Sequence, residues 1–107
     1  MWQIGDRVLA RWPAEVAWWY PGIVCGTSDD FAVIQFDDGD RAQVANEEIS
    51  EIDISVGSRV FGRWLGGPFY YPGLVTSRRG EAIYIRYDDG DEEWTAIAMV
   101  RVERQAD

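Results

Sequence analysis

The sequence contains no histidine, no lysine and a single cysteine, Cys25. The lack of histidine excludes Ser-His-Asp and Cys-His catalysis and every histidine-containing metal site. One cysteine forms neither an intrachain disulfide nor a cysteine-based zinc site. Because Cys25 lies between Val24 and Gly26 in an apolar run, we expect it to be a small, buried core residue. We expect no metal and no cofactor.

Long hydrophobic runs are also missing. No apolar stretch approaches the roughly 20 residues that cross a bilayer, and no signal peptide is visible. These absences predict an intracellular protein without a membrane segment, nuclear in a eukaryote and cytoplasmic in a bacterium.

Basic residues are scarce relative to acidic ones. The 107 residues include 10 arginines against 19 Asp and Glu, which gives a formal net charge of −9. Phosphate binding rests on clustered basic side chains, so this charge weighs against nucleic acid and anionic membranes as partners. A basic partner fits better.

The most informative feature that is present is an internal repeat. Three blocks recur in order: residues 5–12 at 57–64, residues 18–24 at 69–75, and residues 33–40 at 84–91. The register differs by one residue, in the loop between Trp12 and Tyr20. We therefore expect one domain over residues 1–53 and a second over 54–107, joined by a junction short enough for the two to pack against each other.

Each copy has the pattern of an all-β fold. Arg7–Trp12 alternates polar and apolar residues, as a half-buried strand does. Asp38-Gly39 and Asp89-Gly90 predict tight hairpin turns. The Pro-Gly pairs at 21–22 and 72–73 predict a kink or bulge early in the second strand. Five short strands in each copy favour a small, strongly bent barrel.

Strand ends bring aromatic residues together in such a barrel. Trp12 ends the first strand, Phe36 ends the third, and Tyr20 and Trp18 share one face of the second. We expect each copy to gather three aromatic side chains and one carboxylate on one rim: Trp12, Tyr20, Phe36 and Asp38 in the first, and Trp64, Tyr71, Tyr87 and Asp89 in the second. Aromatic faces attract cations, and a methylated ammonium keeps its charge while losing hydration. The same positions are also typical of a plain hydrophobic core.

At these residues the sequence resembles a tandem Tudor domain. Each copy has the Gly-x-x-Val opening, the Tyr-Pro-Gly-x-Val second strand and the Phe/Tyr-Asp-Asp-Gly turn, and the resemblance covers roughly residues 3–104. It implies two tandem five-stranded SH3-like barrels, without catalytic activity, that bind methylated lysine, or methylated arginine as the alternative, on a basic peptide or histone-like tail.

The resemblance also implies which residues form the aromatic cages. Some relatives place a further aromatic residue where this chain has Asp40 and Asp91. We therefore expect each cage to be either open on one side or more acidic than usual, with Trp18 or Phe69 as candidates for the missing wall. The implied cages are Trp12, Trp18, Tyr20, Phe36, Asp38 and Asp40 in the first copy, and Trp64, Phe69, Tyr71, Tyr87, Asp89 and Asp91 in the second.

Two other functions stay open at this point. The aromatic residues also fit a structural protein–protein interaction module without methyl recognition, as a monomer or weak dimer. Aromatic residues that stack on bases, together with Arg78-Arg79, also fit a nucleic-acid-associated domain. The net negative charge of the chain weighs against this alternative. An enzyme is not expected, because Asp37-Asp38-Gly39-Asp40 lacks the distal glutamate of a calcium loop and nothing places two carboxylates across a cleft.

Overall fold

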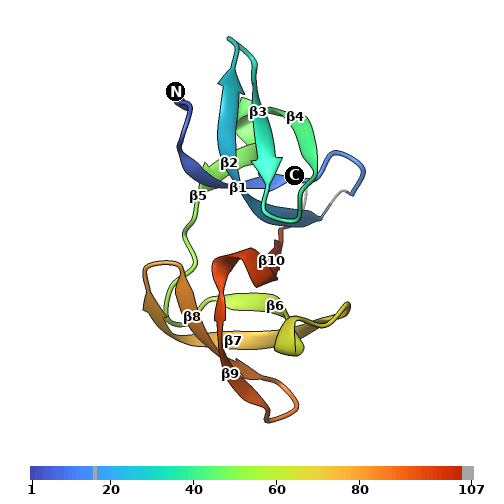
Figure 1. Cartoon of the computed structure of the whole chain (residues 1–107), viewed down its shortest axis with the longest axis vertical. Helices are drawn as coiled ribbons and strands as arrows, with labels where there is room; N and C mark the ends of the chain where they lie inside the picture. The colour runs from blue at the N-terminus through green and yellow to red at the C-terminus, as the bar shows by residue number, and fades with distance from the viewer. Residues whose placement is uncertain (16, 105–107) are drawn as a thin grey trace. The chain divides into compact units, whose positions relative to one another are not determined.

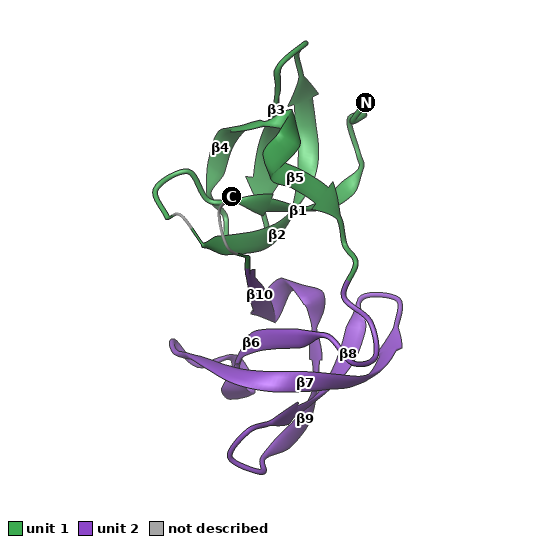
Figure 2. Ribbon diagram, turned by 180° about the vertical axis from the view of Figure 1, so that it is seen from behind, with its two compact units in different colours: residues 1–53, 104–107 green, residues 54–103 purple. Residues whose placement is uncertain are grey.

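The chain forms two compact β units, shown in separate colours in Figure 2. The computed structural model describes residues 1–15 and 17–104. Unit 1 comprises Met1–Asp53 together with Arg104, and unit 2 comprises Ile54–Glu103. Among the described residues, no helix is long and apolar enough to cross a membrane.

Five strands build each unit (Figure 1). Unit 1 contains β1 (Arg7–Arg11), β2 (Trp18–Thr27), β3 (Phe31–Phe36), β4 (Arg41–Ala45), the 3₁₀ turn η1 (Asn46–Glu48) and β5 (Ile49–Glu51). Unit 2 contains β6 (Arg59–Arg63), η2 (Trp64–Gly66), β7 (Tyr70–Arg79), β8 (Ala82–Tyr87), β9 (Glu92–Ala96), η3 (Ile97–Met99) and β10 (Val100–Glu103). The all-β prediction is confirmed.

Antiparallel pairing gives the order β5-β1-β2-β3-β4 in unit 1 and β10-β6-β7-β8-β9 in unit 2. The expected closure into a barrel is not found: within the described residues, no ladder joins β4 to β5 or β9 to β10. The reason lies in η1 and η3. Each is a single three-residue turn that joins the two edge strands end to end, so they do not run side by side.

Alternation along the strands builds the core. Ala32, Ile34 and Phe36 of β3 are buried, while the residues between them are partly exposed. β8 repeats the pattern with Ile83, Ile85 and Tyr87. Successive side chains of a strand point to opposite faces, so one face of each bent sheet encloses an apolar core.

The bulge in each second strand lies later than the sequence predicted. Register shifts occur between Val24 and Gly26 in β2 and between Val75 and Ser77 in β7, not at the Pro-Gly pairs. Cys25 is the extra residue of the first bulge, and it is half-buried rather than buried. The prediction of a core cysteine is therefore wrong, because Cys25 directly follows the buried Val24 and the alternation of β2 points it to the opposite face.

Gly22 and Gly73 serve a different purpose from the one expected. Gly22 pairs with Phe36 in a regular ladder, and a Cβ atom there would lie 2.7 Å from Ile34 Cγ2 and 2.8 Å from the Gln35 carbonyl oxygen. At Gly73 the distance to Ile85 Cγ2 would be 2.6 Å. Both glycines therefore permit a close crossing of neighbouring strands, which lets the sheet bend tightly over its core.

Unit 1 contains one residue from the far end of the described chain. The Arg104 backbone N–H donates to the Ala17 carbonyl at 2.8 Å, and its guanidinium lies over the Trp19 ring, 4.6 Å from the centroid. The same guanidinium donates to Ser50 Oγ at 2.8 Å and pairs with Asp53 at 2.6 Å. Arg104 thus links two separate segments of unit 1, residues 17–19 and 50–53.

Candidate functional site

A cavity of about 90 Å³ lies at one end of unit 1. Trp12, directly after β1, and Tyr20 of β2 provide its aromatic walls. Its acidic side comes from the β3–β4 turn and the β1–β2 loop, which supply Asp38, Asp40 and Glu15. The cavity therefore combines two aromatic rings with three carboxylates.

Phe36 supports this cavity from beneath and does not line it. Its ring is only 2% exposed, and it makes edge-on contacts with Trp12 at 5.4 Å and with Tyr20 at 6.4 Å between centroids. The prediction of Phe36 as a cage wall thus needs correction, because the alternation of β3 directs this side chain into the core with Ile34.

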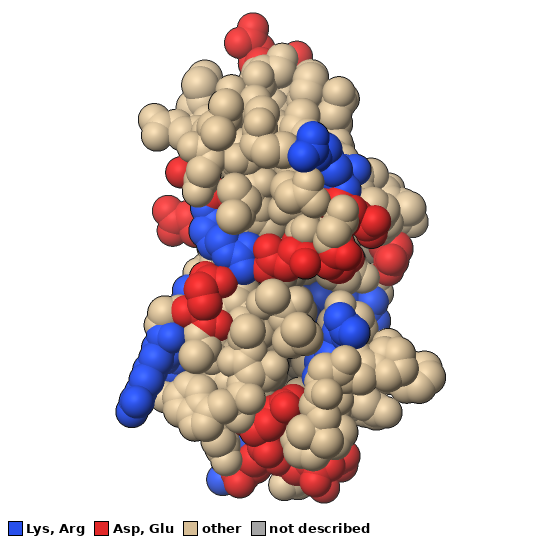
Figure 3. All heavy atoms as spheres, viewed as in Figure 1, with Lys and Arg blue, Asp and Glu red and all other residues tan. Residues whose placement is uncertain are grey.

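The equivalent end of unit 2 holds a larger cavity, of about 160 Å³. It is lined by Trp64, Tyr71 and Tyr87, with Asp89 and Asp91 from the β8–β9 turn. Trp64 and Tyr87 meet nearly at right angles, with centroids 5.5 Å apart and an interplanar angle of 85°. Three aromatic rings and two carboxylates therefore surround this space. Figure 3 shows acidic side chains gathered at that end of unit 2.

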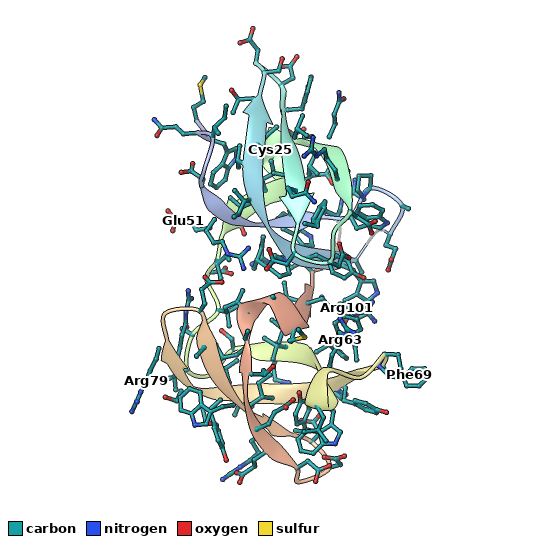
Figure 4. All side chains as sticks on the ribbon, viewed as in Figure 1. Cys25, Glu51, Arg63, Phe69, Arg79 and Arg101 are labelled. Carbon is teal, nitrogen blue, oxygen red and sulfur yellow. The ribbon has the colours of Figure 1, made fainter. Side chains whose placement is uncertain are left out.

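Both residues predicted as candidates for an additional wall, Trp18 and Phe69, lie outside the cavities. Phe69 is 67% exposed and projects away from the loop before β7 (Figure 4). Trp18 is half-buried in β2 and lines neither cavity. Conversely, Glu15 lines the first cavity and was not predicted. It lies in the loop where the two copies differ in length, so the repeat offers no equivalent residue in the second copy that would mark it as a site residue.

The first two aspartates of each Asp-Asp-Gly-Asp turn make different contacts. The first aspartate of each turn pairs with an arginine of the first strand: Asp37 with Arg7, and Asp88 with Arg59 through two contacts of 2.9 and 2.7 Å. The hydrogen bond from Arg59 lowers the pKa of Asp88. The sequence reading missed this role, although both arginines recur in the repeat.

The second aspartate of each turn fixes the turn itself and still faces the cavity. Asp38 Oδ1 accepts the Asp40 backbone N–H, and Asp89 Oδ1 accepts the Asp91 backbone N–H, both at 3.0 Å. This local bond holds each carboxylate at the cavity rim. Only one oxygen is used in this way, so the second oxygen can accept a bond from a ligand.

The rim loops are also held by backbone contacts. Arg63 donates from Nε to the Gly67 carbonyl oxygen at 2.7 Å and from Nη2 to the Gly66 carbonyl oxygen at 3.3 Å. Arg11 pairs with Glu48 and donates to the Glu15 carbonyl oxygen at 3.4 Å. These arginines position the loops that carry Trp12 and Trp64 without entering the cavities.

Three matched differences distinguish the second cavity from the first. Tyr87, Glu93 and Gly62 stand where the first repeat has Phe36, Ala42 and Ala10. The Tyr87 hydroxyl donates to Glu93 at 2.6 Å, and Glu93 also accepts the Leu65 backbone N–H at 3.3 Å. A Cβ atom at position 62 would lie 2.6 Å from the Tyr87 hydroxyl. Gly62 therefore makes room for the hydroxyl, and Glu93 gives it a partner.

This hydrogen-bonded tyrosine makes unit 2 sensitive to alkali. Burial, and then the bond to Glu93, raise the pKa of Tyr87 above its ordinary value of 10.0. The folded protein therefore holds the phenolic proton more tightly than the unfolded chain, and this stabilisation is lost as the pH rises above about 10. As the pH rises from 9 to 11 we therefore expect Tyr87 to lower the free energy of unfolding progressively.

Urea unfolding of the wild type and Tyr87→Phe across this pH range measures that contribution. The variant should show a smaller fall, because the other tyrosines are common to both proteins. Parallel pH profiles for the two proteins would contradict the assignment.

The chemistry available at these sites is the binding of a cation. Aromatic faces and carboxylates both favour positive charge, and water can enter both cavities. Within residues 1–15 and 17–104, no group of three His, Cys, Asp or Glu side chains is arranged to hold a metal ion.

Comparisons with known proteins agree with this architecture. Residues 4–51 match the family model described as the DNA repair protein Crb2 Tudor domain. The chain is similar to the crystal structure of the Crb2 tandem tudor domains, with a TM-score of 0.67 and 17% identity, covering 95% of this chain and 81% of that one. A weaker likeness, with a TM-score of 0.45 and 16% identity, is to AGD34 of Arabidopsis thaliana AGDP1, covering 95% of this chain and 82% of that one. No curated protein matches the sequence. We conclude that residues 4–51 match a Tudor family model and that the whole chain has the fold of a tandem Tudor module.

Proposed function

We propose that this protein is a non-catalytic reader that binds methylated lysine in a basic protein segment. The observation that carries the proposal is the unit 2 cavity, where three aromatic rings and two carboxylates surround a space open to solvent. Methylation weakens the hydration of an ammonium group while keeping its charge. Transfer from water into an aromatic cavity therefore costs less for a methylated lysine than for an unmodified one.

Ring geometry favours methylated lysine over methylated arginine. A planar guanidinium needs a narrow slot between nearly parallel rings. In the unit 2 cavity the Trp64 and Tyr87 rings cross at 85°, which forms two adjoining sides of a box. A box suits the compact shape of a methylammonium group.

The surrounding charge supports a basic partner. The chain carries a net charge of −9, and its cavity rims hold Asp38, Asp40, Asp89 and Asp91. Negative potential around a site attracts basic segments and speeds their association at low salt. Arg78, half of the adjacent basic pair, is engaged with the carbonyl oxygens of Ile54 and Gly80, which weighs against that pair as a phosphate-binding site.

Titration with matched lysine peptides tests this proposal. Peptides with the same basic sequence and unmodified, monomethylated, dimethylated or trimethylated lysine should be added to the ¹⁵N-labelled protein. We expect methyl-dependent shifts of the Trp64 indole N–H signal and dissociation constants in the micromolar range or weaker, because each aromatic contact contributes roughly 0.5–2 kcal/mol. Signals that shift equally with all four peptides would support an interaction module without methyl recognition.

A further inference from the structure

We infer that the two cavities select different cations: unit 2 takes a fully methylated ammonium, and unit 1 takes an ammonium that keeps N–H groups. This inference rests on the proposed function, since it assumes that the cavities bind cations. It assigns each cavity its own ligand class.

The lining of the unit 1 cavity favours a hydrogen-bond donor. Its two aromatic rings stand against three carboxylates, Glu15, Asp38 and Asp40, in a volume of about 90 Å³. A carboxylate that loses water needs a replacement donor, and a quaternary ammonium has none to offer. An ammonium with N–H groups supplies charge-assisted hydrogen bonds to these oxygens.

The lining of the unit 2 cavity favours methyl groups. It has one more aromatic wall, one fewer carboxylate and a volume of about 160 Å³. The additional wall is Tyr87, whose counterpart Phe36 lies beneath the first cavity without lining it. Methyl groups carry the diffuse positive charge of a quaternary ammonium directly onto such faces.

Glu93 increases the preference of the unit 2 cavity for a methylated ammonium, although it acts only through Tyr87. It accepts the Tyr87 hydroxyl at 2.6 Å and does not itself line the cavity. A phenol that donates to a carboxylate is polarised, which increases the negative charge on its ring face. Ala42 stands at the equivalent place in unit 1 and has no such effect. Glu93 is thus a positioning residue for Tyr87.

Two small cations separate these preferences without an identified peptide. Tetramethylammonium chloride and methylammonium chloride are titrated into the full ¹⁵N-labelled chain, with sodium chloride at equal ionic strength as the control. The Trp12 and Trp64 indole signals are assigned from Trp12→Phe and Trp64→Phe. Tetramethylammonium should bind at Trp64 roughly fivefold or more tightly than at Trp12, because one aromatic wall more is available. Methylammonium should show the reverse order.

The outcomes distinguish this inference from the function on which it rests. Equal affinities of both cavities for both cations, or a preference of Trp12 for tetramethylammonium, would overturn the division while leaving cation binding intact. No response of either indole beyond the sodium chloride control would overturn both. The inference is supported only if tetramethylammonium binds more tightly at Trp64 than at Trp12 and methylammonium binds more tightly at Trp12 than at Trp64.

A charge-neutral variant tests the role of the third carboxylate. Glu15→Gln should weaken methylammonium binding at Trp12 by roughly two- to fivefold, as loss of an exposed ionic contact does. Binding of tetramethylammonium at Trp64 should stay unchanged. Glu47→Gln is the matched control, because Glu47 is exposed in the same unit and does not line the cavity. Equal effects of the two substitutions would show that only overall charge matters.

Discussion

Replacing Gly22 by alanine should lower the free energy of unfolding by about 2–3 kcal/mol. The added Cβ would lie 2.7 Å from Ile34 Cγ2, 2.8 Å from the Gln35 carbonyl oxygen and 3.2 Å from Phe36 Cα. Two of these three atoms belong to the backbone of β3, which cannot move aside without breaking its ladder with β2. The strain therefore reaches the core under Trp12 and Tyr20.

Gly26→Ala in the same strand is the matched control. A Cβ at position 26 would meet Val33 side-chain atoms at 3.4 Å, close to ordinary van der Waals contact, and without a positive φ. We expect a change of less than about 1 kcal/mol, in either direction. Urea unfolding followed by tryptophan fluorescence measures both variants. If Gly22→Ala is as stable as Gly26→Ala, the close crossing of β2 and β3 does not constrain the unit.

Removing Trp64 should have the largest effect on ligand binding. Trp64→Ala deletes one aromatic wall of the unit 2 cavity and also the edge-on support of Tyr87 at 5.5 Å. We expect affinity for a trimethyllysine peptide to fall at least about tenfold, since a desolvated cation–π contact contributes about 2 kcal/mol. Isothermal titration calorimetry with the peptide measures the loss.

Trp94→Ala provides the comparison for this variant. Trp94 is 49% exposed on β9, contacts Tyr84 edge-on at 5.3 Å between centroids, and does not line the cavity. The Trp94→Ala variant also loses one tryptophan side chain from unit 2, but it keeps the cavity walls. Its affinity for the trimethyllysine peptide should therefore match that of the wild type. Equal losses in the two variants would place peptide recognition outside the cavity.

Much of the architecture could be predicted from the sequence, because repeated blocks fix equivalent strands. The alternation of Arg7–Trp12 and the Asp-Gly turns located β1 and both hairpins within a residue or two. The position of the bulges could not be predicted. A bulge needs only one additional residue between two ladder pairs, and Cys25 and Thr76 carry no sequence feature that marks this role.

The candidate sites show the same division. The aromatic and acidic residues at strand ends could be predicted as site residues, because strand alternation and turn type depend only on residues that are close in sequence. Phe36 was misread although the sequence held the signal: it shares a face with Ala32 and Ile34, which are buried. Tyr87 is also buried, yet it lines its cavity, and this depends on Gly62 and Glu93, which lie far away in sequence.

Arg104 has a consequence for the order in which the molecule is assembled. During synthesis, Trp19 and Asp53 leave the ribosome about fifty residues or more before the arginine that binds them. Chains generally fold from the N-terminus as they emerge. The first unit therefore acquires its last contacts only after the second has been translated, and a fragment ending at residue 53 lacks them permanently.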